Sequence, residues 1–277
     1  MYKDFYRFAE KPFEDVLNPK FFYRTPAYQK MVTSLLAWVR DGHGFAVITG
    51  EAGTGKTLFI QSFLSSLGEK TKSIVVPNPA ATFKELLKQL FWSLGQPVEN
   101  ETRAALLHRF MKYLKQFREQ GDTLLVVLDE CQDLSDQVLE DVQHFLGLKS
   151  KPIRAVLVGQ PDLTGNIEAP GLLRLRQGIS LRLQMKPLTE EETRQYLAFR
   201  LHGAGGNPEL FTPKAVSLLY RYTRGIPSLI NHVCDNALRL GYTHNQRRID
   251  ADLIEETIRN LDGPGTSRKI FSPSSFR

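Results

Sequence analysis

The segment Gly50–Thr57 reads GEAGTGKT and combines three glycines with a closing Lys-Thr pair. Glycine backbones can curl until several N–H groups point at one spot, which makes a socket for phosphate oxygens. At the spacing G-x-x-x-x-G-K-T, the lysine can reach the outer phosphates of a nucleotide and the threonine hydroxyl can bind Mg²⁺. The apolar run FAVIT directly precedes the loop. This order of residues predicts a strand followed by a phosphate-binding turn.

Each position of this loop receives a role in binding ATP and Mg²⁺. Lys56 is expected to reach the β- and γ-phosphate oxygens, and Thr57 is expected to bind the metal. A helix that begins at Lys56 adds the positive end of its dipole. The alternative interpretation is a glycine-rich turn without a ligand. The remaining cofactor-binding positions, which are expected to cradle the α- and β-phosphates, are Gly50, Glu51, Ala52, Gly53, Thr54 and Gly55.

A second segment, TLLVVLDE, ends an apolar run in two adjacent carboxylates. Asp129 is expected to complete the Mg²⁺ site, and Glu130 is expected to polarise the water that attacks the γ-phosphate. Two acids that merely cap a strand end are the alternative. Because P-loop kinases have little use for a water-activating acid, the two segments together predict a nucleotide hydrolase.

Further polar residues follow at Gln160 and in the stretch LLRLRQGISLRL. Gln160 comes directly after the apolar run RAVLVG, at the sheet edge where open α/β proteins bind ligands, and could sense the γ-phosphate or orient the water. A turn residue before Pro161 is the alternative. Arg174, Arg176 and Arg182 could each be offered to the γ-phosphate of a neighbouring subunit, or be solvated charge.

Five apolar runs of strand length must position these groups. They are Phe45–Thr49, Ser73–Pro77, Thr123–Leu128, Arg154–Gly159 and the weaker Ile179–Met185. Continuous hydrophobicity is typical of parallel strands that are covered on both faces. Candidate helices between them are Lys56–Leu67, Thr82–Leu94, Thr102–Gln120 and Asp136–Leu146. This alternation predicts an α/β doubly wound domain.

After Pro187 the pattern becomes purely helical. Thr189 and Glu192 are spaced as a capping box, and Thr212 caps a helix whose first turn holds a proline. Helical periodicity continues over 228–240 and 250–261. We therefore divide the chain into a nucleotide-binding core at 1–186, an all-helical unit at 187–262 and a disordered tail at 263–277.

Composition limits the class of protein. The 277 residues are 42% hydrophobic and 24% charged, which is typical of soluble globular proteins. The sequence has no unbroken apolar run of membrane-spanning length and no signal-peptide core at its start. Two distant cysteines, Cys131 and Cys234, argue against a disulfide scaffold or zinc site and favour the cytoplasm. The net charge of +6 is dispersed, which favours a solvated basic surface over a dedicated nucleic-acid face.

Together these segments resemble the AAA+ ATPases of the general secretion pathway protein A (ExeA) type, a group with relatives in mannose-sensitive haemagglutinin pilus biogenesis and polysaccharide export. The resemblance runs from Met1 to about Leu261. It is carried by the opening MYKDFYRFAEKPFEDVLNPKFFYRT and by GFAVITGEAGTGKT, VVPNP, VVLDECQDL, VLVGQPDL, LFTPKAVSLLYRYTRGIPSLIN and RRID. It implies a five-stranded parallel AAA+ core, a helical lid, and ring-like or stacked self-assembly.

Members of this group assist the assembly of envelope machines such as secretins or pili. The resemblance therefore implies a cytoplasmic ATP hydrolase whose partners are copies of itself and envelope or secretion proteins, which could hold it at the inner membrane. Transposition-helper ATPases share the fold and motifs and bind DNA. A DNA-binding recombination helper is thus an alternative, with nucleic acid ranked second as a partner.

Two positions depart from the pattern of the group. Gly178 in LRQGI stands where the group usually has arginine, and Ser228 follows GIP where it also usually has arginine. Arg176 and Arg224 are the nearest replacements. If they do not serve, the chain is expected to bind ATP and hydrolyse it slowly when isolated, as a nucleotide-gated scaffold.

Overall fold

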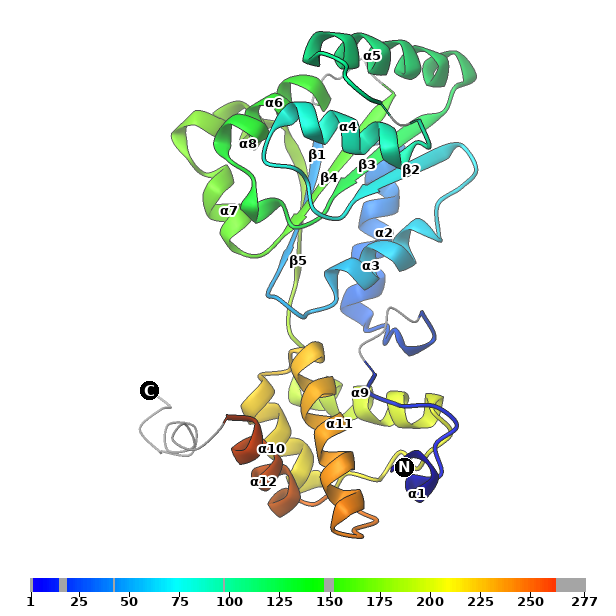
Figure 1. Cartoon of the computed structure of the whole chain (residues 1–277), viewed down its shortest axis with the longest axis vertical. Coiled ribbons are helices and arrows are strands. Elements are labelled where there is room, and N and C mark those ends of the chain that lie inside the picture. Colours follow the sequence, from blue (N-terminus) through cyan, green and yellow to red (C-terminus); the bar gives the residue numbers. More distant parts are fainter. Residues whose placement is uncertain (1, 15–18, 42, 97, 147–151, 263–277) are drawn as a thin grey trace. The chain divides into compact units, whose positions relative to one another are not determined.

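The computed structural model describes residues 2–14, 19–41, 43–96, 98–146 and 152–262 (Figure 1). The chain forms two compact units. An α/β unit comprises Pro26–Ala52 and Lys56–Met185. A helical unit comprises the described residues of Met1–Thr25, Gly53–Gly55 and Lys186–Arg277.

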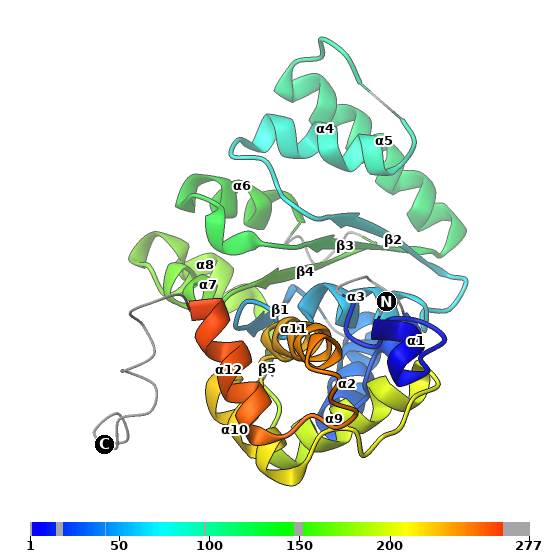
Figure 2. The same ribbon diagram turned by 60° about the horizontal axis from the view of Figure 1, so that its bottom comes forward.

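The α/β unit is built on five parallel strands in the order β2-β3-β4-β1-β5 (Figure 2). The strands are β1 (Phe45–Gly50), β2 (Thr71–Val76), β3 (Thr123–Leu128), β4 (Ile153–Gly159) and β5 (Ile179–Met185). All five predicted strands are confirmed. In the register, Leu128 pairs with both Val76 and Leu157, and Thr49 pairs with Gly159. The carboxyl ends of β1, β3 and β4 therefore meet at one edge of the sheet.

Helices surround this sheet on both faces. They are α2 (Pro26–Asp41), α3 (Lys56–Leu64), α4 (Phe83–Ser93), α5 (Arg103–Gln120), α6 (Asp136–Leu146), α7 (Asp162–Ile167) and α8 (Leu173–Gly178), with 3-10 turns η2 (Cys131–Asp133) and η3 (Pro170–Leu172). The four predicted helices form, and the hydroxyls of Thr82 and Thr102 cap α4 and α5 as expected. Helix α3 ends before the predicted Leu67, where the Ser65 and Ser66 hydroxyls bond to carbonyls of the preceding turn.

The core of the α/β unit explains its continuous apolar runs. Helices α4, α5 and α6 lie on one side of the sheet and α2 and α3 on the other (Figure 2). On the first side, the ring of Phe110 lies 5.7 Å from that of Phe91 and 5.2 Å from that of Phe145. On the second, α3 contributes Phe59 and Phe63, both fully buried. Because both faces are covered, every residue of β1 is buried.

The helical unit contains α9 (Glu190–Gly203), α10 (Pro213–Thr223), α11 (Pro227–Thr243) and α12 (Ala251–Asp262), preceded in the chain by α1 (Tyr2–Tyr6) and η1 (Pro19–Phe21). The predicted capping box is present, because the Thr189 hydroxyl accepts from the Glu192 N–H and the Glu192 carboxylate accepts from the Thr189 N–H. Thr212 likewise caps α10 ahead of Pro213. The four helices expected after Pro187 are thus confirmed.

The N-terminal segment differs from the domain division expected from the sequence, which placed it with the strands. Five of its aromatic side chains are buried in the same hydrophobic cluster as α9–α12: Tyr2, Tyr6, Phe8, Phe13 and Phe21. The Tyr6 hydroxyl donates to the Gln246 carbonyl at 2.8 Å, and the Tyr2 hydroxyl donates to Asp235. Burying these rings groups the described residues of this segment, 2–14 and 19–25, with the helical unit. The expected tail, 263–277, lies outside the described residues.

Candidate nucleotide-binding site

The glycine-rich loop joins β1 to α3 at the shared edge of the sheet. Gly53 and Gly55 have φ angles of +78° and +92°, a backbone region that other residues rarely adopt. At the end of the loop, the Lys56 ammonium donates to the carbonyls of Gly50 at 2.8 Å and Glu51 at 3.2 Å. The lysine is thus curled back over its own loop, at the position where phosphate oxygens are expected.

Lys56 is a charged group held in an unusually dry place. It is only 5% exposed. Burial lowers its pKa below the usual 10.5, while the charges of Glu130 and Asp129 oppose that shift. A buried ammonium bonded only to neutral carbonyls gains from an anionic ligand, because the anion replaces the lost solvation.

Thr57 and Asp129 come together as the sequence suggested. The Thr57 hydroxyl donates to the Asp129 carboxylate at 2.8 Å, although the two residues are 72 positions apart. Asp129 is 3% exposed, and burial raises its pKa above the usual 3.8, opposed by hydrogen bonds from Thr57 and the Glu130 N–H. The pair joins the start of α3 to the end of β3.

The donor set fits Mg²⁺ bound together with a nucleotide. Mg²⁺ prefers oxygen ligands and is usually held by one or two carboxylates, with waters and substrate phosphates filling the other positions. Thr57 and Asp129 offer one hydroxyl and one carboxylate, close to the loop that would hold the phosphates. Among the described residues, no group of three or more His, Cys, Asp or Glu side chains forms a self-sufficient metal site.

Glu130 follows Asp129 in a left-handed backbone conformation, with φ of 61°. This conformation is uncommon for a residue with a side chain, and such strain concentrates at functional sites. One oxygen of its carboxylate accepts a hydrogen bond from the Gln132 amide nitrogen at 2.8 Å. The Gln132 amide therefore orients the Glu130 carboxylate.

Gln160 lies just beyond β4, at the same edge. Its backbone N–H donates to the Gln132 amide oxygen at 3.0 Å, which links it to Glu130 through one side chain. The role of the Gln160 amide toward phosphate stays a prediction. Sequence reasoning missed Gln132, although a polar residue two positions after the acidic pair, in LDECQDL, was a usable signal.

The candidate arginines have partners of their own. Arg176 donates to Glu168 at 2.9 Å, and an Arg182 nitrogen lies 3.7 Å from the same carboxylate. Arg174 lines a cavity of about 280 Å³ beside α6. Arg224 is the left-handed C-cap of α10, and Ser228 lies in the first turn of α11. A role for these residues toward a γ-phosphate stays a prediction.

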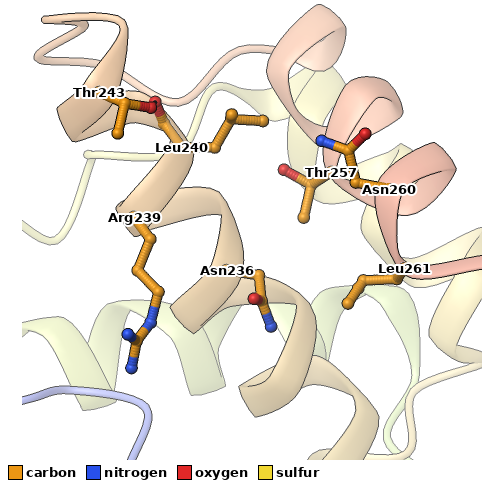
Figure 3. Close-up of a pocket in the computed structure, with 7 residues that line it drawn as sticks. All are labelled: Asn236, Arg239, Leu240, Thr243, Thr257, Asn260 and Leu261. Atoms are coloured by element: carbon orange, nitrogen blue, oxygen red, sulfur yellow. Dashed lines mark hydrogen bonds between the residues drawn. The ribbon is translucent and has the colours of Figure 1, made fainter.

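The helical unit has a cavity of its own, of about 330 Å³, between α11 and α12 (Figure 3). Asn236 and Arg239 line it from α11, while Thr257 and Asn260 line it from α12. It includes none of the residues predicted for nucleotide or metal. The sequence-predicted site therefore belongs to the edge of the sheet and not to this cavity.

Comparison with known proteins agrees with this architecture. A family model described as an AAA domain matches residues 39–167. General secretion pathway protein A of Aeromonas hydrophila is 32% identical over 273 residues, or 96% of this chain. In sequence, the chain is similar to the AAA+ ATPases of the general secretion pathway protein A type. It spans about half the length of that relative, 50%.

Solved AAA+ structures share the fold at low sequence identity. Cdc6p of Pyrobaculum aerophilum superposes with a TM-score of 0.69 at 17% identity, covering 89% of this chain and 69% of that chain. The Aeropyrum pernix ORC1 protein, solved in complex with DNA, gives 0.67 at 20% identity, covering 92% and 69%. These matches confirm the predicted AAA+ fold with its five-stranded parallel sheet and helical C-terminal region. Among the described helices, none has the length and apolar character needed to cross a bilayer.

Proposed function

We propose that the α/β unit binds ATP with Mg²⁺ and hydrolyses it. The observation that carries this proposal is the 2.8 Å hydrogen bond from Thr57 to Asp129, formed next to a buried Lys56 and a strained Glu130. A hydroxyl, a carboxylate, an ammonium and a second carboxylate at the end of a glycine-rich turn are the groups that ATP hydrolysis needs. Similarity to the AAA+ ATPases supports nucleotide hydrolysis as the reaction class.

Each side chain contributes a separate task. The loop N–H groups and Lys56 bind and orient the phosphates, and Thr57 with Asp129 would hold Mg²⁺. When bound, Mg²⁺ neutralises charge that develops on the transferred phosphoryl group. Glu130 orients a water and accepts its proton as the water attacks the γ-phosphate, so the products are ADP and inorganic phosphate. Gln160 would contact that phosphate through its side-chain amide.

The remaining parts of the chain are assigned roles within the same proposal. Residues 187–262 act as the lid, and Arg176 is the candidate for a charge offered to a neighbouring copy in a ring-like or stacked assembly. Since Gly178 and Ser228 replace expected arginines, the isolated chain turns over slowly. The name of its relative, General secretion pathway protein A, supports secretion machinery as the partner, with pilus or polysaccharide-export machinery as further candidates. A cytoplasmic protein peripheral to the inner membrane fits such partners.

Binding and hydrolysis can be tested separately. Lys56→Ala is expected to abolish binding of a labelled ATP analogue, because it removes the phosphate-binding ammonium. Glu130→Gln is expected to keep binding and lower phosphate release at least about 100-fold, because only the water-activating carboxylate is lost. The exposed Glu119→Gln on α5 is the matched control. Tight binding by Lys56→Ala, or ordinary turnover by Glu130→Gln, would show that the roles are misassigned.

A DNA-binding helper is the second candidate, because the chain is basic, with a net charge of +6. Dispersed charge favours weak, sequence-independent binding that fades as salt rises. Fluorescence anisotropy with duplex DNA at physiological salt separates the two functions. Submicromolar, ATP-dependent binding would place the DNA-binding function first.

A further inference from the structure

Gln132 uses its whole side-chain amide within the candidate site. Its nitrogen donates to Glu130 at 2.8 Å and to Asp133 at 3.2 Å, and its oxygen accepts from the Gln160 N–H at 3.0 Å. Its backbone carbonyl accepts from the Asn166 amide at 3.0 Å. The reversed amide would set a donor against the Gln160 N–H and an oxygen against two carboxylates. The amide therefore has one chemically consistent orientation.

The end of β4 is shaped to receive this amide. A Cβ atom built on Gly159 would lie 2.9 Å from the Gln132 amide oxygen and 3.0 Å from a Leu163 methyl group. The first distance is shorter than real Cβ contacts and the second is tighter than most of them, so glycine at this position favours the close approach of Gln132. Gln132 is the second residue of η2, two positions after the strained Glu130. Two strand ends are thus joined by one side chain.

We propose that Gln132 is a positioning residue for ATP hydrolysis. It fixes the direction of the Glu130 carboxylate and ties that carboxylate to the carboxyl end of β4, next to Gln160. A water-activating carboxylate must be aimed at one water, and a misplacement of about 1 Å can cost about 100-fold in rate. If the end of β4 moves when Gln160 contacts the γ-phosphate, the Gln132 amide would move the Glu130 carboxylate with it. This inference rests on the proposed hydrolysis of ATP.

The role predicts a specific split between binding and turnover. Gln132→Met keeps the length of the side chain and removes both kinds of hydrogen bond. Its kcat for ATP is expected to fall about 10- to 100-fold, while the Kd for Mg-ATP stays within about twofold. Gln116→Met, the same change at an exposed position of α5, is expected to leave both unchanged.

A double-mutant cycle separates positioning from general support of the fold. If Gln132 acts through Glu130, Gln132→Met lowers single-turnover phosphate release in the wild type and has no further effect in Glu130→Gln. An equal fold-loss in both backgrounds, an unchanged or raised kcat, or a large loss of Mg-ATP affinity would each overturn the proposal.

A second variant guards against misfolding. Gln132→Glu keeps an acceptor for the Gln160 N–H but replaces the donor to Glu130 with a carboxylate, so a similar fall in kcat is expected. If Gln132→Met fails to fold, this variant decides the outcome by the same criteria. A wild type that does not hydrolyse ATP would refute the proposed function and this inference with it. An active wild type matched by active Gln132 variants would refute this inference alone.

Discussion

The α/β unit and the helical unit each bury a basic side chain, but they treat it differently. Arg200 of α9 is 4% exposed and donates to the backbone carbonyls of Pro12 and Glu14, the latter at 3.0 Å. Its guanidinium carbon also lies 4.6 Å from the centre of the Phe21 ring. Among the described residues, Lys56 donates to carbonyls of its own loop alone. It is 5% exposed, and this burial lowers its pKa.

We interpret Arg200 as a charge that stabilises the fold and Lys56 as a charge that is stabilised by a bound ligand. Arg200 links two segments about 190 positions apart, because its guanidinium donates hydrogen bonds to the N-terminal segment. The carbonyls that accept from Lys56 belong to its own loop. Burial also disfavours the charged form of the nearby Asp129, because it raises the pKa of that carboxyl. We infer that the α/β unit buries these charges because a bound nucleotide and metal ion would compensate for their lost solvation.

The largest effect on stability is expected at Arg200. Arg200→Met leaves the Pro12 and Glu14 carbonyls without these donors and removes the contact with Phe21, so the free energy of unfolding should fall by about 3 kcal/mol. Arg194→Met on the same helix is the control, since its solvent-exposed pair with Glu191 should contribute far less to stability. Urea denaturation measures both. If both variants lost the same free energy of unfolding, Arg200 could not be called a structural charge, and its contrast with Lys56 would fail.

A smaller effect of opposite sign is expected at Asp129 in the nucleotide-free protein. A carboxyl whose pKa rises on folding holds its proton more tightly when folded, so its contribution to stability falls as pH rises from below 3.8 through the raised pKa. At pH 7, Asp129→Asn removes this cost and keeps one side-chain oxygen as a hydrogen-bond acceptor, so the free energy of unfolding should rise.

The pH dependence identifies the source of that gain. The advantage of Asp129→Asn should shrink as pH falls through the raised pKa and vanish below 3.8, where the carboxyl is protonated in both states. Glu119→Gln, at an exposed position, is the control variant. A destabilised Asp129→Asn at pH 7 would mean that Asp129 is a structural charge like Arg200.

The sequence was most informative where the signal is local. The loop, the acidic pair, the five strands and the capping box at Thr189 depend on neighbours within a few positions, and each was predicted. The packing of the described N-terminal residues was not predicted, because Tyr2 and Tyr6 bond to partners more than 200 positions away. Gln132 was missed for a similar reason, since its partner at Gln160 is brought near only by the pairing of β3 with β4.

The central claim, that Lys56 is buried for a ligand and Arg200 for the fold, is tested most directly by thermal unfolding with and without Mg-ATP. At about 100 times the Kd, ATP should stabilise the wild type by about 2.7 kcal/mol, or roughly 5–10 °C in Tm. Arg200→Met should melt lower and show the same shift, whereas Lys56→Met should show none. A full shift in Lys56→Met, or its loss in Arg200→Met, would contradict this account.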